Sequence, residues 1–175
     1  MEFPDLYNDG IEKAKTSGVV IENLLIVGMV AMGFRCMYKA GINGIPIVSI
    51  IYVLFILIML IFVLRKQLCA VCYYYGKQCH CGWGKLSSAL FKQGSGNRDL
   101  GGKLAGLTWG VTMVLPIVVS VSLLIMGKTL IMEEIKFLAP FLILVVINGV
   151  LHKKSCENCK MRYICPGSAA RTRIE

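Results

Sequence analysis

Seven of the eight cysteines lie in two short polar segments, at spacings that suit metal or redox chemistry. The first segment carries Cys69, Cys72, Cys79 and Cys81, and the second carries Cys156, Cys159 and Cys165. Two thiols separated by two residues offer a pair of soft ligands to a metal ion, or form the dithiol of a redox-active motif. This density of cysteine is far from the composition of an ordinary chain, so a chemical role is expected.

Three chemistries fit these thiols. An iron–sulfur cluster takes four ligands and strongly favours cysteine, and structural zinc accepts four cysteines or three cysteines and a histidine. The third is thiol–disulfide exchange. His80, between Cys79 and Cys81, is a candidate eighth ligand that would complete two sites of four ligands each. We favour a [4Fe–4S] cluster, with Zn²⁺ as the alternative. The primary expected ligands are Cys69, Cys72, Cys156 and Cys159, followed by Cys79, Cys81 and Cys165. We expect His152 to be an interfacial cap or headgroup contact rather than a ligand.

Residues 156–165 read CENCKMRYIC, with an aromatic-aliphatic pair before the last cysteine. This segment resembles the auxiliary-cluster cysteine motif of SPASM-type radical enzymes, which implies ligation of an iron–sulfur cluster. Pro166-Gly167-Ser168 stands where that family usually has glycines and another cysteine, so a fourth ligand would come from the first segment. The catalytic barrel of those enzymes has no counterpart in this chain. The resemblance therefore concerns ligation and not activity.

Long apolar runs separate the cysteine segments and must position them. Apolar residues make up 56% of the chain, and the mean hydropathy is +0.67. Because about 20 apolar residues cross a hydrocarbon core, the runs predict membrane helices over about 18–34, 45–64, 104–126 and 135–151. Glu22 and Asn23 interrupt the first run, where we expect them at the level of the lipid headgroups. The predicted fold is an all-α integral membrane protein, a four-transmembrane-helix bundle forming one membrane domain over residues 1–175.

The order of the helices places both cysteine-rich segments, 65–103 and 152–175, on the same side of the bilayer, because two crossings lie between them. Of the 19 Lys and Arg residues, fifteen fall in these segments and the N-terminal lead-in. Basic residues mark the cytoplasmic side of short loops. We therefore predict a cysteine-rich cytoplasmic cap, with both termini on the cytoplasmic side of the cell membrane. Cys36 falls on the opposite side and is not expected to be a ligand.

Two features of the first cysteine-rich segment concern the membrane surface. Tyr73, Tyr74, Tyr75 and Trp83 are expected to form an interfacial aromatic belt. Residues 85–92 predict a short amphipathic helix lying in the interface.

The predicted function is that of a redox subunit, which passes electrons between a soluble donor and a membrane partner, or of an accessory subunit. The alternatives are a structural zinc-site adaptor or assembly protein, and a membrane thiol oxidoreductase similar in outline to four-helix quinone-linked disulfide formers. The surrounding partner is the lipid bilayer, and a homo-oligomer is compatible with the sequence. The net charge of +9 follows topology, so nucleic acid is not an expected partner. The sequence contains no phosphate loop, Ser/His/Asp set or paired catalytic carboxylates, and it predicts no particular reaction.

Overall fold

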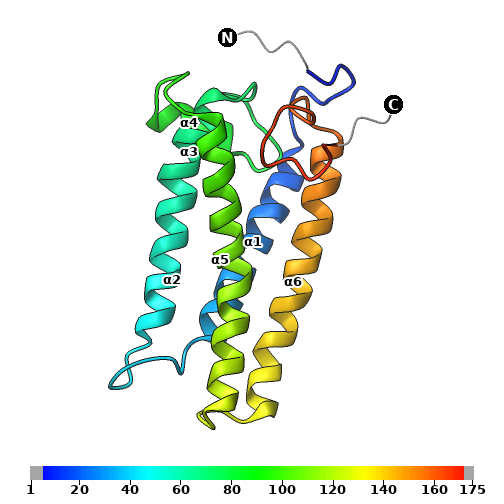
Figure 1. Ribbon diagram of the computed structural model, residues 1–175. Helices are drawn as coiled ribbons and strands as arrows, with labels where there is room; N and C mark the ends of the chain where they lie inside the picture. Colours follow the sequence, from blue (N-terminus) through cyan, green and yellow to red (C-terminus); the bar gives the residue numbers. More distant parts are fainter. Residues whose placement is uncertain (1–5, 172–175) are drawn as a thin grey trace.

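The computed structural model describes residues 6–171 of this protein, and these residues form an all-helical fold (Figure 1). Within them there is no β-strand, only isolated bridges that pair Ile11 with Cys159 and Ile42 with Ile45. The helices are α1 (Thr16–Cys36), α2 (Ile47–Ile58), α3 (Leu64–Gln67), α4 (Trp83–Leu90), α5 (Arg98–Ile125) and α6 (Ile131–Glu157). A π-helical segment, Met59–Val63, joins α2 to α3, and a 3₁₀ turn, Cys69–Val71, follows α3.

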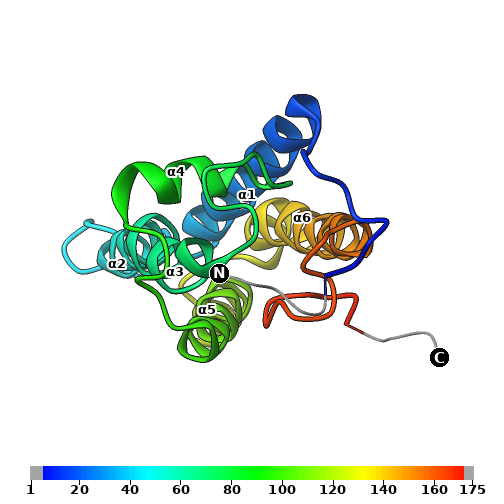
Figure 2. The same cartoon turned by 90° about the horizontal axis from the view of Figure 1, so that it is seen from above.

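Four of the helical stretches are long and apolar enough to cross a membrane: Thr16–Cys36, Ile47–Val71, Arg98–Ile125 and Ile131–Glu157. They lie side by side as a bundle, with α1 packed against α6, α5 and α2 (Figures 1 and 2). The short connections 37–46 and 126–130 lie at one end of the bundle. The cysteine-rich segments lie at the other end, above α3 and α6. The prediction of four long apolar helices is therefore confirmed.

Two of the helices extend beyond the apolar runs that predicted them. α5 begins at Arg98, where the side chain of Asn97 accepts a hydrogen bond from Leu100 N at 3.1 Å and caps the helix. α6 continues past residue 151 to Glu157, because the lysines that follow the apolar run are good helix formers. His152 and Cys156 consequently lie one turn apart on the same face of α6.

The interior of the bundle contains small and polar side chains. Ser49, Thr108, Thr112 and Ser120 are all at most 1% exposed. Pro116, inside α5, has no N–H to donate to Thr112 O one turn earlier. The hydroxyl of Tyr52 donates to that carbonyl at 3.1 Å, so the acceptor freed by the proline is satisfied by a neighbouring helix.

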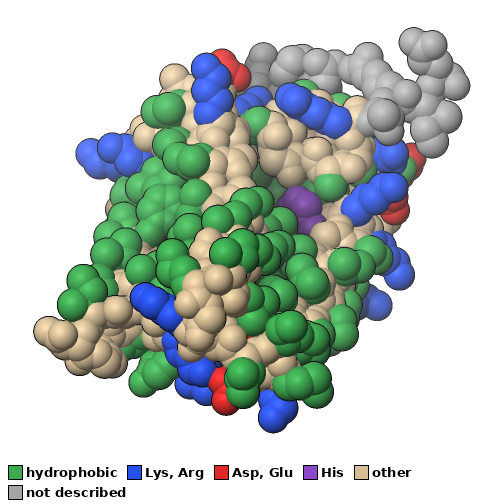
Figure 3. All heavy atoms as spheres, turned by 60° about the horizontal axis from the view of Figure 1, so that its bottom comes forward, with side chains coloured by type: hydrophobic (Ala, Val, Ile, Leu, Met, Phe, Trp, Pro, Cys, Tyr) green, Lys and Arg blue, Asp and Glu red, His purple; other side chains and the backbone are tan. Residues whose placement is uncertain are grey.

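The outer surfaces of the long helices are apolar instead. Large side chains that are at least half exposed occur on each of them, including Leu24, Leu54, Val114 and Val146. Figure 3 shows hydrophobic side chains over the flank of the bundle and Lys and Arg side chains gathered toward its ends. This distribution, with apolar groups outside and polar groups inside, is the reverse of that in a water-soluble helical bundle.

The helix expected near residues 85–92 is α4. It follows Gly82, which has a φ of +72° and whose Cβ, if present, would stand 2.7 Å from Val19 in α1. Gly84 and Ser87 face the protein, whereas Leu86 and Leu90 are 41% and 45% exposed. α4 is therefore amphipathic, with its apolar side facing outward.

Candidate metal centre in the cysteine-rich cap

Three segments that are far apart in the sequence build the cap, which we define as residues 6–15, 68–97 and 158–171. They meet at the end of the bundle above α3 and α6 (Figures 1 and 2). Backbone hydrogen bonds join the first segment to the third, from Tyr7 N to Lys160 O and from Ile11 N to Asn158 O. A further bond from Ala14 N to Gln78 O joins the first segment to the second. The N-terminal segment thus holds the two cysteine-rich segments together.

Tyr74 lies at the centre of the cap. Its hydroxyl donates to Ile11 O at 2.5 Å and accepts from Lys160 N at 3.2 Å, so one side chain connects all three segments. The residue is 3% exposed and forms a buried cluster with Cys159 and Met161. Partly buried side chains that pack against this cluster include Cys72, Cys79 and Cys165. Tyr74 is therefore a structural centre of the cap and not part of a surface aromatic belt.

Cys72, Cys79 and Cys165 pack against the same buried cluster, and Cys69 is close enough to act on the thiol of Cys72 through its charge. Burial raises the pKa of the Cys72 thiol, and the charges of Cys165, Cys69 and Cys79 raise it further. Burial also raises the pKa of Cys165, with additional contributions from Cys156 and Cys69. Thiols with raised pKa values stay protonated at neutral pH unless a cation or metal favours the thiolate.

A buried cation stands beside this group. Arg65 is 2% exposed; its Nη1 donates to Cys69 Sγ at 3.2 Å and its Nε donates to Leu60 O at 2.5 Å. The guanidinium carbon lies 3.2 Å from the centre of the Trp83 ring. None of the ion pairs among residues 6–171 joins Arg65 to a carboxylate. A buried guanidinium requires negative charge nearby, and thiolates on Cys69 and its neighbours would supply it.

The remaining predicted ligands lie on the other side of the cap, between α1 and α6. Cys156 Sγ is 3.6 Å from His152 Nε2, and Cys81 Sγ donates to Glu22 Oε1 at 3.5 Å. His80 stands between these pairs: its Nε2 is 4.0 Å from Glu22 Oε1, and its ring centre is 5.9 Å from that of His152. Cys159 packs against Tyr74, between the two groups.

Burial governs the ionisation of the groups on this side. It lowers the pKa of His80 to about 4, with a smaller contribution from His152, so the imidazole is neutral at pH 7. It raises the pKa of Cys159 to about 11 and that of Cys81 well above its ordinary value. At neutral pH His80, Cys81 and Cys159 are therefore uncharged, and a metal ion could convert them to ligands, whereas His152 and Cys156 contact each other at 3.6 Å.

For three residues of the cap region, the structure differs from what the sequence led us to expect. Glu22 is 8% exposed and faces His80 and Cys81, whereas we expected it among the headgroups. His152 lies beside Cys156 and not at a free helix end. Arg65 was counted only as one basic residue among many. The available signal was the spacing of His152 and Cys156, which are four residues apart and so share one face of α6.

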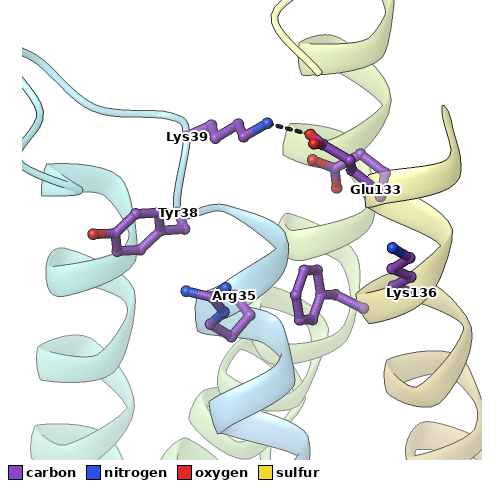
Figure 4. Close-up of a pocket in the computed structure, with 7 residues that line it drawn as sticks. Arg35, Tyr38, Lys39, Glu133 and Lys136 are labelled. Carbon is purple, nitrogen blue, oxygen red and sulfur yellow. Dashed lines mark hydrogen bonds and ion pairs between the residues drawn. The ribbon is translucent and has the colours of Figure 1, made fainter. Parts of the chain in front are cut away.

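The opposite end of the bundle carries a different arrangement. Cys36 is 1% exposed and packs with Met29 and Phe141, away from the other thiols as expected. Next to it is a cavity of about 290 Å³ (Figure 4). Lys39 forms an ion pair with Glu133 across its mouth. The residues lining the cavity are Arg35, Tyr38, Lys39, Glu133, Glu134, Lys136 and Phe137.

The fold and the site thus define an all-helical protein with four long apolar helices and a cysteine-rich cap at one end. No family model, no curated protein and no solved structure matches this chain.

Proposed function

We propose that this protein is an integral membrane protein whose cap holds a cysteine-ligated iron–sulfur centre, and that it acts as a redox or accessory subunit. The membrane assignment is supported by the four long apolar helices and by their exposed apolar surfaces. About 20 residues in a helix span the hydrocarbon core, and each of these helices is at least that long. Polar side chains inside the bundle donate hydrogen bonds between helices, from Ser49 to Phe34 O and from Tyr52 to Thr112 O, as expected in lipid.

The orientation follows from charge. The cap and the segments near it carry most of the Lys and Arg residues, whereas the other end of the bundle carries four, Arg35, Lys39, Lys128 and Lys136. Basic loops remain in the cytoplasm, so the cap and both termini face the cytoplasm of a cell membrane. That compartment is reducing, which keeps the thiols available as ligands and disfavours disulfides.

One observation carries the metal proposal: Cys72, Cys79 and Cys165 pack against one buried cluster, and Cys69 is bound by Arg65, a buried arginine that has no carboxylate partner among the described residues. Three of these ligands come from the first cysteine segment and one from the second. Four thiolates are the ligand set of a [4Fe–4S] cluster. The guanidinium of Arg65 would offset part of their negative charge.

The spacing of the sulfurs favours a cluster over a single zinc ion. Around one zinc ion, four sulfurs at about 2.3 Å from the metal stand about 3.8 Å from each other. Cluster thiolates bind separate iron atoms and stand further apart. Within residues 6–171, the groups of three ligand atoms that lie within 4.8 Å of one another each include His80 and one cysteine. Cys69, Cys72, Cys79 and Cys165 form no such group among the described residues, as expected of thiolates that bind separate iron atoms.

A centre at the cytoplasmic surface of a membrane bundle suits electron transfer from a soluble donor to a membrane acceptor. The outward apolar side of α4, with Leu86 and Leu90, would lie in the interface beside the centre. Two other functions remain as outcomes of the test. They are a zinc-site adaptor, in which the metal ties the cap together, and a thiol oxidoreductase, in which Cys69 and Cys72 exchange electrons as a dithiol.

The test is anaerobic purification in detergent, followed by measurement of iron, acid-labile sulfide and the visible spectrum. We expect a brown protein with four iron and four sulfide per chain. Replacing Cys69, Cys72, Cys79 or Cys165 by serine should remove the chromophore, and the control Cys36→Ala should keep it. Colourless protein with stoichiometric zinc would establish the adaptor function instead, and metal-free protein with titratable thiols would establish the oxidoreductase.

Orientation is tested separately with a thiol reagent that does not cross membranes. In intact cells the six thiols of the cap and Cys156 should remain unlabelled, and they should label after the membrane is opened. A variant that carries a single added cysteine at Asn43, in the connection at the other end, should label from outside. Labelling of the cap in intact cells would reverse the proposed topology.

A further inference from the structure

Five potential metal ligands from three parts of the chain converge beside the four-thiol group. Glu22 comes from α1, His80 and Cys81 from the segment before α4, and His152 and Cys156 from α6. The ligand atoms of His80, His152 and Cys156 lie within 4.8 Å of one another. Those of Glu22, His80 and Cys81 do so as well. Because His80 belongs to both sets, the five residues surround one region.

From this arrangement we infer that His80, Cys81, His152 and Cys156 hold a single divalent transition-metal ion such as Zn²⁺, with the Glu22 carboxylate at its edge. The site is distinct from the proposed four-thiolate centre and shares no ligand with it. Two imidazole nitrogens and two thiolates form a tetrahedral set that zinc accepts.

The distances agree with coordination to one ion. With metal–nitrogen and metal–sulfur bonds of about 2.0 and 2.3 Å, a tetrahedral nitrogen–sulfur pair is separated by about 3.5 Å. The separation between His152 Nε2 and Cys156 Sγ is 3.6 Å. Glu22 Oε1 is 3.5 Å from Cys81 Sγ and 4.0 Å from His80 Nε2, so small side-chain movements bring all the ligands to a common centre.

Burial and charge point to a cation in the same place. Glu22 is 8% exposed in a helix apolar enough to cross a membrane, where an unpaired carboxylate is costly. Its one ion-pair partner among the described residues is His80, itself one of the proposed ligands, at 4.0 Å. A divalent ion bound to two thiolates and two neutral imidazoles has no net charge, and the Glu22 carboxylate would interact with the ion itself at the edge of the site.

A second set of hydrogen bonds holds the ligands in place. Asn23 Nδ2 donates to Cys81 O at 3.0 Å, and Trp83 Nε1 donates to Asn23 Oδ1 at 2.9 Å, which fixes the loop that carries His80 and Cys81 onto α1. His152 Nε2 lies 3.0 Å from Gly167 O, and coordination through this nitrogen would exchange that carbonyl for the ion. Metal binding would therefore change the hydrogen bonding of the C-terminal segment of the cap, residues 158–171.

The experiment uses the full chain in detergent, stripped of loosely held metal with a chelator and then titrated anaerobically with Co²⁺ as a spectroscopic substitute for zinc. We expect one equivalent of Co²⁺ to produce intense visible bands of tetrahedral coordination and a thiolate-to-cobalt band in the near ultraviolet, and Zn²⁺ to displace it. His80→Ala and His152→Ala should weaken binding at least about 100-fold, since even outer-shell partners contribute 10- to 100-fold.

Rescue and independence complete the test. His152→Cys supplies another zinc ligand and should restore the cobalt spectrum with a stronger thiolate band, which separates loss of a ligand from misfolding. Neither histidine variant should change the iron and sulfide content, whereas Cys69→Ser should remove iron and keep the cobalt site. Unchanged cobalt binding in both histidine variants would overturn the inference. So would failure of the wild-type protein to bind cobalt, whatever its iron content.

Discussion

Arg65 offers a quantitative test of the proposed iron–sulfur centre, since it is the buried cation closest to the four-thiol group. The change is Arg65→Met, which keeps a long side chain and removes the charge. In the wild-type protein, Nη1 of Arg65 lies 3.2 Å from Cys69 Sγ. An iron bound to that sulfur would lie about 2.3 Å further on, a metal–thiolate bond length, or about 5.5 Å from the charge.

The magnitude follows from Coulomb's law. At about 5.5 Å and an effective dielectric constant of about 20, a unit charge stabilises an added electron by about 3 kcal/mol. For a one-electron couple, 59 mV corresponds to a tenfold change in the equilibrium, so this energy equals about 130 mV. Arg65→Met should therefore lower the reduction potential by about 130 mV, because the reduced cluster loses a favourable charge. Arg65→Lys is the matched control, since it keeps the charge and loses the planar fork.

The assay is a redox titration of anaerobically purified protein, followed through the visible absorption and the electron paramagnetic resonance of the reduced cluster. The shift in reduction potential caused by Arg65→Lys should be at most about a third of that caused by Arg65→Met, because the charge remains close to the sulfur. A shift below about 30 mV in Arg65→Met, or equal shifts in the two variants, would refute the reasoning that Arg65 acts on the centre through its charge.

Four further predictions concern the stability of the fold and cap. Tyr74→Phe removes the bond donated to the N-terminal segment and leaves a buried acceptor unsatisfied, so thermal unfolding in detergent should show a loss of about 1–3 kcal/mol. Gly84→Ala places a Cβ against the backbone carbonyls of residues 74 and 77 and should displace α4, so that proteolysis of the cap becomes faster. Gly106→Ala is the control: its Cβ meets nothing within 4 Å, and the cleavage rate should stay unchanged. In metal-free protein, His80 faces Glu22 and His152, and burial lowers its pKa from 6.5 to about 4. As the pH falls, the unfolded state binds the proton first. The free energy of unfolding should therefore fall by about 3 kcal/mol in total between about pH 6.5 and about pH 4. In denaturant titrations, His80→Gln should remove this part of the pH dependence. Glu133→Gln breaks an exposed ion pair at the other end of the bundle and should cost less than about 1 kcal/mol by the same unfolding measurement; a larger loss would show that the pair is not screened by solvent.

The local features of the chain could be predicted from the sequence because they depend on short-range properties. The apolar runs predicted the four long helices, and the amphipathic pattern of residues 85–92 predicted α4. The first and last residues of the helices were harder to predict from the sequence. α5 starts at an Asn97 cap, and α6 runs through Lys153 and Lys154, because helix formation continues wherever the backbone bonds can form and not only where residues are apolar.

The sequence did not predict which of the potential ligands meet one another in the cap. The two CxxC pairs were the primary expectation for one site, but the charges that act on Cys72 come from Cys165, Cys69 and Cys79, whereas Cys156 lies beside His152. Spacing along the chain identifies pairs of potential ligands. It does not identify which pairs from distant segments face each other, since that depends on how the segments cross in the cap.

By itself, the sequence determined where the four long helices lie, although not their ends, and, by counting crossings, that both cysteine segments gather at the same end of the bundle. The tertiary structure alone decided that Arg65 lies against Cys69, that Glu22 faces His80, and that Tyr74 joins the three segments of the cap. The physical reason is that helices with apolar residues on all sides carry little signal for the rotation of each helix about its axis. Only close packing at Gly33, Tyr52 and Pro116 selects that rotation, and with it the set of side chains that meet in the cap.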